Sequence, residues 1–128
     1  MTKIISMSLS DELLTEIDRI QKEGGFSGRS EVMRAGIRML LADTREKERL
    51  VGRHDAVLIA IHSPSAEDAV TLIKHSFEDI ITTQMHSHLK DDKCMEIFTI
   101  QGEAPRIREF VRSFQHSKKL EYLKLIVA

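Results

Sequence analysis

The sequence lacks features that mark several large classes of protein. It has 128 residues, a single cysteine and a net charge of −1. One cysteine excludes an internal disulfide and is typical of a reducing compartment, so we expect a cytoplasmic protein. No hydrophobic run approaches the roughly 18 residues of a membrane span, and the N-terminus has no hydrophobic core of a signal peptide, so no membrane partner is expected. A balanced charge also excludes a global basic field, so any nucleic-acid contact must come from local geometry.

The first ten residues carry a period of two. Residues 4–9 alternate, with Ile5, Met7 and Leu9 on one face, and predict a short strand. A lone strand with one apolar face needs a partner, and the simplest partner is its own copy. Two copies would form an antiparallel ribbon of the width that fits the DNA major groove. The residues facing the bases would be Ile4, Ser6 and Ser8. The alternative is a dimerisation module that touches no nucleic acid.

Two helices are expected after this strand. Ser10, followed by two acidic residues, predicts a helix start, and Gly24–Gly25 predicts its end. A second helix should begin near Gly28 and end near Ala42. Its N-terminal amides would suit a DNA phosphate. The residues expected there are Gly28, Arg29 and Ser30.

The pattern changes after a charged run that begins at Asp43. Apolar segments then alternate between strand and helix periods in the order βαββαβ, which predicts a ferredoxin-like unit of about 75 residues. We therefore expect an α+β protein with two domains and a short linker. The expected bounds are residues 1–46, a linker at 47–53, and residues 54–128.

The most informative stretch is a predicted hairpin with two histidines and the single cysteine. His86 and His88 share one face of a strand, roughly 7 Å apart. A turn near Asp91 would place Cys94 opposite His88, where cross-strand side chains lie about 5 Å apart. Two imidazoles and a thiol would then converge, which predicts a metal site. The alternative is a solvated strand face beside a cysteine of the core.

A further histidine lies on the preceding helix. His75 is near the C-terminal end of that helix, roughly 20 Å from the histidines of the hairpin. It could cap its helix, or it could join the metal site of a neighbouring chain. His62, at the end of the first strand of this unit, is interpreted as a surface histidine, with an auxiliary-ligand role as the alternative.

Two resemblances bear on these residues. The strand, the Leu9–Leu14 segment and the Gly25–Glu31 segment resemble the ribbon-helix-helix (βαα) DNA-binding domains, which form intertwined dimers. Nearly the whole chain resembles the NikR-type nickel-responsive regulators, which add an ACT-type domain and assemble as homotetramers, dimers of dimers. Their ligand spacing, H-x10-H-x-H-x5-C, is matched by His75, His86, His88 and Cys94.

The resemblance implies a Ni(II)-responsive regulator of transcription, which we expect to repress metal-uptake genes at a double-stranded DNA operator. It also implies that His75 reaches the opposite subunit's site and that Glu96 is an acidic residue beside the ligands. Ile4 departs from the family, which places a basic residue there.

Other functions remain open at this stage. Square-planar coordination by three imidazoles and a thiolate favours Ni(II) or Cu(II), and tetrahedral coordination favours Zn(II), so the donors alone do not name nickel. The alternatives are a regulator that responds to Cu, Co or Zn, or one that binds an amino acid at the ACT-like domain. An enzyme with Cys94 as nucleophile is not expected, because no orienting third group or oxyanion site accompanies it.

Overall fold

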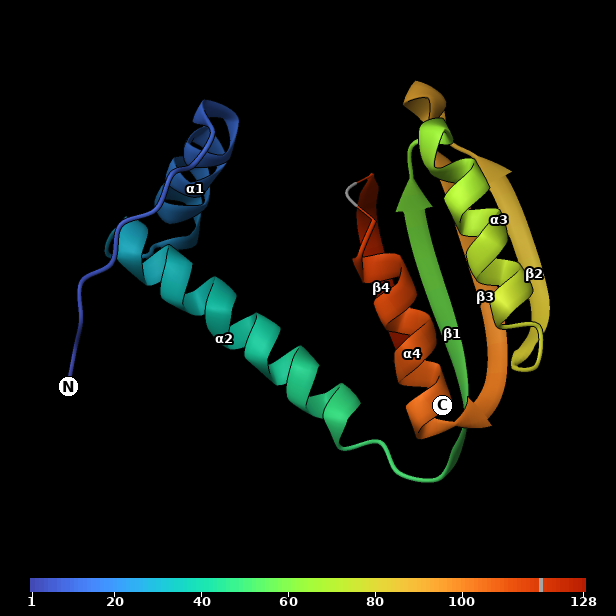
Figure 1. Ribbon diagram of the computed structural model, residues 1–128. Coiled ribbons are helices and arrows are strands. Elements are labelled where there is room, and N and C mark those ends of the chain that lie inside the picture. Colours follow the sequence, from blue (N-terminus) through green and yellow to red (C-terminus); the bar gives the residue numbers. More distant parts are fainter. Residues whose placement is uncertain (118) are drawn as a thin grey trace. The chain divides into compact units, whose positions relative to one another are not determined.

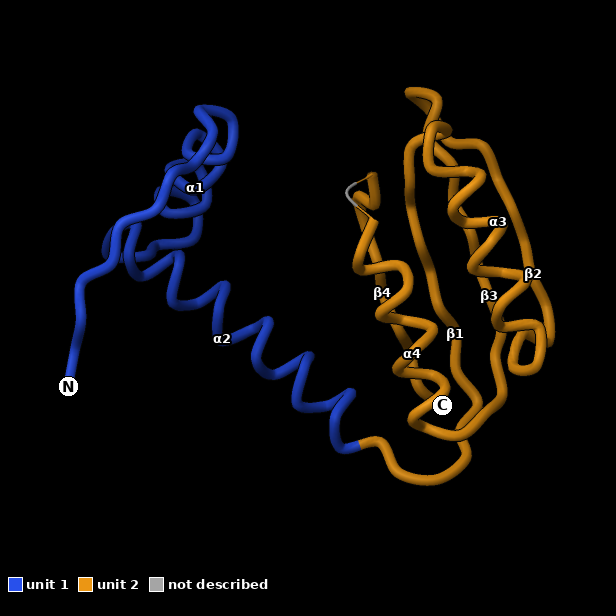
Figure 2. The backbone as a smooth tube through the Cα atoms, in the orientation of Figure 1, with its two compact units in different colours: residues 1–49 blue, residues 50–128 orange. Residues whose placement is uncertain are grey.

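The computed structural model describes residues 1–117 and 119–128 (Figure 1). The chain divides into two compact units, residues 1–49 and 50–128 (Figure 2). In the described part of the chain, no helix is both long and apolar enough to cross a membrane.

The first unit contains two helices, α1 (Asp11–Gly24) and α2 (Arg29–Glu48). The predicted cap of α1 is confirmed, because Ser10 Oγ accepts a hydrogen bond from the Leu13 amide at 3.2 Å. The predicted stop is also confirmed. Gly25 adopts the left-handed conformation with φ of 70°, which a glycine tolerates without steric cost.

Two predictions for this unit differ from the structure. Residues 4–9 form no strand, because a strand needs a hydrogen-bonding partner and a single chain supplies none. Helix α2 does not end near Ala42 but continues through the charged run to Glu48, where Lys47 Nζ lies 2.9 Å from Asp43 Oδ2. Ile17 is the one hydrophobic residue of residues 1–49 that the structure buries, so this unit lacks a closed core in the single chain.

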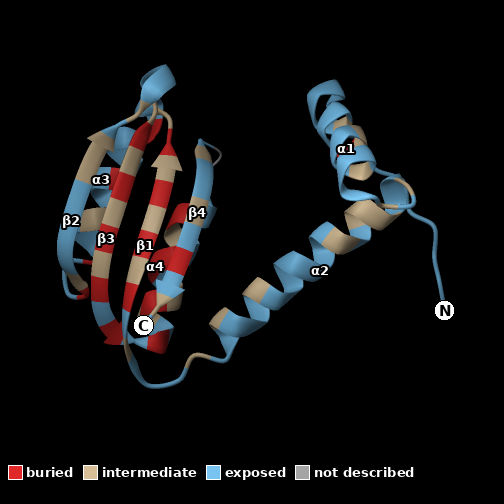
Figure 3. Cartoon of the chain, turned by 180° about the vertical axis from the view of Figure 1, so that it is seen from behind, coloured by how far each residue is buried: buried red, intermediate tan, exposed pale blue. Residues whose placement is uncertain are grey.

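The predicted βαββαβ order of the second unit is confirmed. Its elements are β1 (Arg53–His62), α3 (Glu67–Ser76), β2 (Ile81–His88), β3 (Cys94–Glu103), α4 (Ala104–Gln115) and β4 (Leu120–Val127). Its strands form one antiparallel sheet in the order β2-β3-β1-β4, and α3 and α4 cover one face of it (Figures 1 and 3). Two short 3-10 turns, Pro64–Ala66 and Lys90–Asp92, join elements.

The core lies between the sheet and the two helices. Phe98 of β3 packs against Phe110 and Phe114 of α4, with ring centroids 5.2 and 5.7 Å apart, and all three are fully buried. The described helices of this unit leave the opposite face of the sheet uncovered (Figure 3). Its side chains are nevertheless largely apolar, and they include Val57, Ile59, Ile61, Met85, Met95, Ile97, Tyr122 and Ile126.

The turn after α3 is fixed to α4 by Arg106. Its Nε and Nη2 donate to the two carboxylate oxygens of Asp79 at 3.0 and 2.9 Å. Nη2 also donates to the carbonyl of Ser76 at 2.6 Å, and the guanidinium lies 4.2 Å from the ring centroid of Phe77. These contacts hold the last turn of α3 in place.

Replacing Asp79 with asparagine should lower stability in a pH-dependent way. Hydrogen bonds from Arg106 hold the pKa of Asp79 below its ordinary value. A depressed pKa in the folded state gives a contribution that is present above the unfolded value of about 3.9 and lost as pH falls through the folded value. Thermal unfolding should therefore separate the variant from the wild type at pH 7 and bring the two together in acid. A gap that widens on acidification would contradict this assignment.

Candidate metal centre

The β2–β3 hairpin brings the predicted residues together. At its turn, Asp91 and Asp92 adopt positive φ of 63° and 57°, which aspartate tolerates better than most residues. The resulting register pairs His88 with Cys94 and His86 with Glu96. The predicted placement of Cys94 opposite His88 is therefore confirmed.

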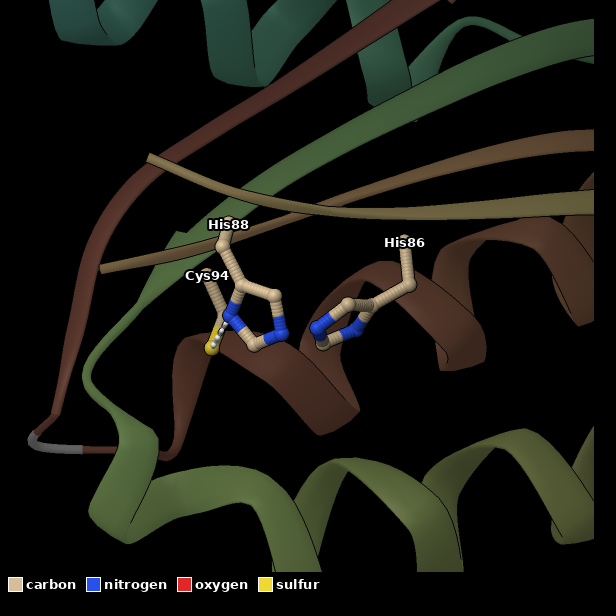
Figure 4. Close-up of side chains that lie close together, drawn as sticks. All are labelled: His86, His88 and Cys94. Carbon is tan, nitrogen blue, oxygen red and sulfur yellow. Dashed lines mark hydrogen bonds between the residues drawn. The ribbon is translucent and has the colours of Figure 1, made fainter. Parts of the chain in front are cut away.

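Three side chains converge at the end of this hairpin (Figure 4). One ligand atom from each of His86, His88 and Cys94 lies within 4.8 Å of the others. Cys94 Sγ is 4.0 Å from His88 Nδ1, and the two imidazole centroids are 5.0 Å apart. Cys94 is buried, whereas His88 is exposed. A soft thiol and two imidazoles form a donor set typical of a late first-row transition metal.

Glu96 is a fully buried carboxylate next to this cluster. Its Oε1 lies 2.5 Å from His86 Nδ1 and 3.3 Å from Lys74 Nζ of α3. A carboxylate can only accept, so His86 Nδ1 carries the hydrogen and Nε2 is left free to bind a metal. Within the described residues, Glu96 Oε2 has no hydrogen-bond partner.

The interpretation of His62 as a surface histidine is wrong. Only 1% of its surface is exposed, because it continues the inward face of β1, which also holds Ala60. Its Nδ1 donates to the Ser63 carbonyl at 2.9 Å, and its Nε2 lies 3.5 Å from Glu96 Oε1. The period of two along β1 is the signal that would have identified this burial.

The thiol of Cys94 is protonated at neutral pH. Burial raises the pKa of Cys94, and the negative charges of Glu67 and Glu96 raise it further. A metal ion that binds the thiolate must therefore displace a proton.

Nickel affinity should rise with pH for this reason. Below the raised pKa of the Cys94 thiol, each unit of pH reduces proton competition for the thiolate and strengthens binding. Competition with a chelator of known affinity, repeated from pH 6 to 9, measures the slope. No slope between pH 8 and 9, where an ordinary imidazole is already neutral, would show that the thiol is not a ligand.

His75 lies apart from the three clustered residues. It is 69% exposed near the C-terminal end of α3, and its Nδ1 is 2.8 Å from Glu78 Oε1. The group of clustered ligand atoms does not include it.

The residues predicted to contact DNA are mostly exposed, and Gly28 is half-buried. Ile4 is fully exposed, and Ser6 and Ser8 lie on the same segment without secondary structure. Arg29 donates two hydrogen bonds to the Asp18 carboxylate, at 2.8 and 3.0 Å, and thereby lowers the pKa of Asp18. Gly28 precedes α2, and among the residues that the structure describes no side chain caps that N-terminus.

The chain matches two known families, one for each unit. Residues 56–128 match the NikR C-terminal nickel-binding domain, and residues 3–44 match the ribbon-helix-helix proteins of the CopG family. The chain belongs to the NikR family of nickel-responsive regulators. Membership means that its N-terminal unit is a DNA-binding domain of a class that dimerises, that its C-terminal unit is a Ni(II)-binding domain, and that the protein is a regulator rather than an enzyme.

Similar proteins cover nearly the whole chain. Relatives from Methanocaldococcus jannaschii and Methanococcus vannielii, both named provisionally as nickel-responsive regulators, are 35% identical over 96% of this chain and 89% of their own. A relative from Haloarcula marismortui with the same name is 33% identical over 90% of this chain and 85% of its own. The structure of an uncharacterised protein from Thermotoga maritima has a similar fold, with a TM-score of 0.54 and 10% sequence identity. The match covers 59% of this chain and 96% of that protein.

Proposed function

We propose that this NikR-family protein is a cytoplasmic, nickel-dependent repressor whose metal site is shared between chains. His86, His88 and Cys94 of one chain would hold the ion together with His75 of a second. The observation that carries the proposal is the convergence of three donor atoms within 4.8 Å on the β2–β3 hairpin. When bound, nickel supplies a fixed set of bonds that ties the two chains together.

A fourth donor from a second chain fits the geometry of the hairpin. β2 is an edge strand, so one side of it is free to meet another chain. A surface hollow between α3 and β2, lined by Thr71, Lys74, His75, Glu78, Ile81 and Gln84, lies along the same strand as His86 and His88. A copy related by a two-fold axis and running antiparallel would bring each His75 to the other chain's cluster. Two chains would therefore share two equivalent sites.

Apolar surface in both units supports assembly into a homotetramer. In the first unit, Ile5 is 77% and Met7 56% exposed, and pairing with a second copy would cover them in a two-stranded ribbon. In the second unit, Tyr122 and Ile126 are about half exposed on the uncovered face of the sheet (49% and 50%). If each chain contacts one copy through its first unit and another copy through its second unit, four chains form a dimer of dimers.

DNA recognition would follow from the ribbon. Its outward residues, Ile4, Ser6 and Ser8, would enter the major groove, and the start of α2 at Gly28, Arg29 and Ser30 would meet the phosphates. Metal bound at the shared sites would fix the separation of two ribbons and so favour an operator with two half-sites. A cytoplasmic location suits this role, because the operator and a reduced Cys94 are both available there.

The structure favours a metal over an amino acid as the effector. Gly102, the position at which an amino acid would be expected to bind, is a buried residue of β3, and an added Cβ there would lie 2.7 Å from Ile80 Cγ2. By contrast, the donor atoms of the metal cluster already face one another.

Equilibrium dialysis and duplex selection test this function together. Dialysis should give one tightly bound nickel per chain, with Cu(II), Co(II), Zn(II) and free amino acids tested in parallel. Selection from a random pool of duplex DNA should then recover a two-half-site sequence with nickel and none without it. Nickel-dependent loss of transcript from a template carrying that sequence would establish repression. Binding of less than about 0.1 nickel per chain would contradict the proposal.

A further inference from the structure

The last turn of α3 pairs His75 with a carboxylate. His75 Nδ1 lies 2.8 Å from Glu78 Oε1, three residues along the chain. A carboxylate only accepts, so the imidazole must carry its hydrogen on Nδ1 and leave Nε2 free. Free neutral imidazole has no such constraint, because either nitrogen can hold the hydrogen. The contact therefore selects one of two tautomers of His75.

The backbone of Glu78 is held in place on both sides. Phe77 is buried and packs against Phe110, with ring centroids 5.0 Å apart. Asp79 accepts two hydrogen bonds from Arg106, which also donates to the Ser76 carbonyl. These anchors hold the residues on both sides of Glu78, whose carboxylate reaches His75 from that position.

The same arrangement occurs at the other end of the candidate site. Glu96 accepts from His86 Nδ1, and Glu78 accepts from His75 Nδ1. Both histidines would thus offer Nε2 to the ion, one from each chain. Glu96 is fully buried, whereas Glu78 is 71% exposed, so water competes for the His75 contact until a second chain covers it.

The geometry points to Glu78 as a positioning residue: its carboxylate holds His75 in the tautomer that presents Nε2 to the metal site of the opposite chain. This inference rests on the proposed shared site. Carboxylates that orient a ligating histidine in this way typically change metal affinity 10- to 100-fold when they are removed, and the exposure of Glu78 places the expected loss at about 10-fold.

Two measurements on the full-length protein test the role. Nitrogen-15 NMR of the imidazoles, without metal and above pH 7.5, should show that His75 carries its hydrogen on Nδ1. The His75 signals are identified as those that are absent from the spectrum of His75→Ala. In Glu78→Ala the Nε2–H tautomer should appear and nickel affinity should fall about 10-fold. Glu78→Gln keeps an accepting oxygen and should retain part of both properties. Glu46→Ala removes another exposed carboxylate, on α2, and should match the wild type.

The outcomes separate the inference from the function on which it rests. An unchanged tautomer in Glu78→Ala overturns the inference. Wild-type nickel affinity in Glu78→Ala also overturns it, provided that His75→Ala loses affinity, and the shared site then stands. Wild-type affinity in both variants overturns the shared site and the inference together.

Discussion

Replacing Cys94 with alanine should abolish the nickel response. Cys94 is the only cysteine in the chain, so no other thiolate can take its place. Removing a residue that hydrogen-bonds to a metal ligand typically lowers metal affinity 10- to 100-fold. Removing a ligand itself should lower it more, so nickel affinity should fall by more than about 100-fold. Chelator competition measures the affinity, and a nickel titration of DNA binding measures the response. The absorption band of a nickel–thiolate bond should disappear as well.

Suitable controls separate a lost ligand from a lost fold. Cys94 is 99% buried and its alanine variant removes a single sulfur atom, so only a modest loss of stability is expected. His88→Ala removes a more exposed member of the same cluster and should reproduce the nickel defect. His116→Ala removes an exposed histidine at the end of α4 and should bind nickel like the wild type. Wild-type nickel binding by folded Cys94→Ala would overturn the site.

Mixing two inactive variants should restore nickel binding. His75→Ala keeps the cluster of His86, His88 and Cys94, whereas Cys94→Ala keeps His75. If each site takes His75 from a second chain, a mixed pair holds one complete site and one site that lacks both His75 and Cys94. With free exchange at equal concentrations, about half of the pairs are mixed, so about one quarter of all sites should recover nickel binding.

The control for this experiment is a mixture that cannot complement. Cys94→Ala and His88→Ala both damage the cluster and both keep His75, so their mixture should bind no nickel above the separate variants. Stoichiometry by dialysis and the nickel–thiolate band give two independent readouts. Mass spectrometry under native conditions should confirm that the chains exchange. Exchanged pairs of His75→Ala and Cys94→Ala that recover nothing would show that the site is not shared in this way.

The part of the candidate site that sequence predicts is the part set by local geometry. A strand places every second side chain on one face, and a turn of fixed length sets which residues meet across a hairpin. His86, His88 and Cys94 satisfy both conditions, and their ligand atoms meet in the structure. The helix bounds at Ser10 and Gly25 are equally local, because a cap depends on residues three or four positions away.

The remaining features depend on contacts between segments far apart in the chain. Residues 4–9 have the pattern of a strand but form none, because their partner must be another chain. His62 carries a polar ring, which suggested the surface, yet β1 directs it inward beside Glu96, 34 residues away in the sequence. The Glu96 carboxylate contacts Lys74 of α3 and His86 of β2, which lie on two different elements.

Sequence alone therefore determined the order of the elements and the family, and it predicted the donor set and its spacing. Tertiary structure alone decided which nitrogen of His86 is free, since that depends on where the buried Glu96 carboxylate lies. The physical reason is range: side-chain periodicity acts over a few residues, whereas a buried hydrogen bond depends on how whole elements pack.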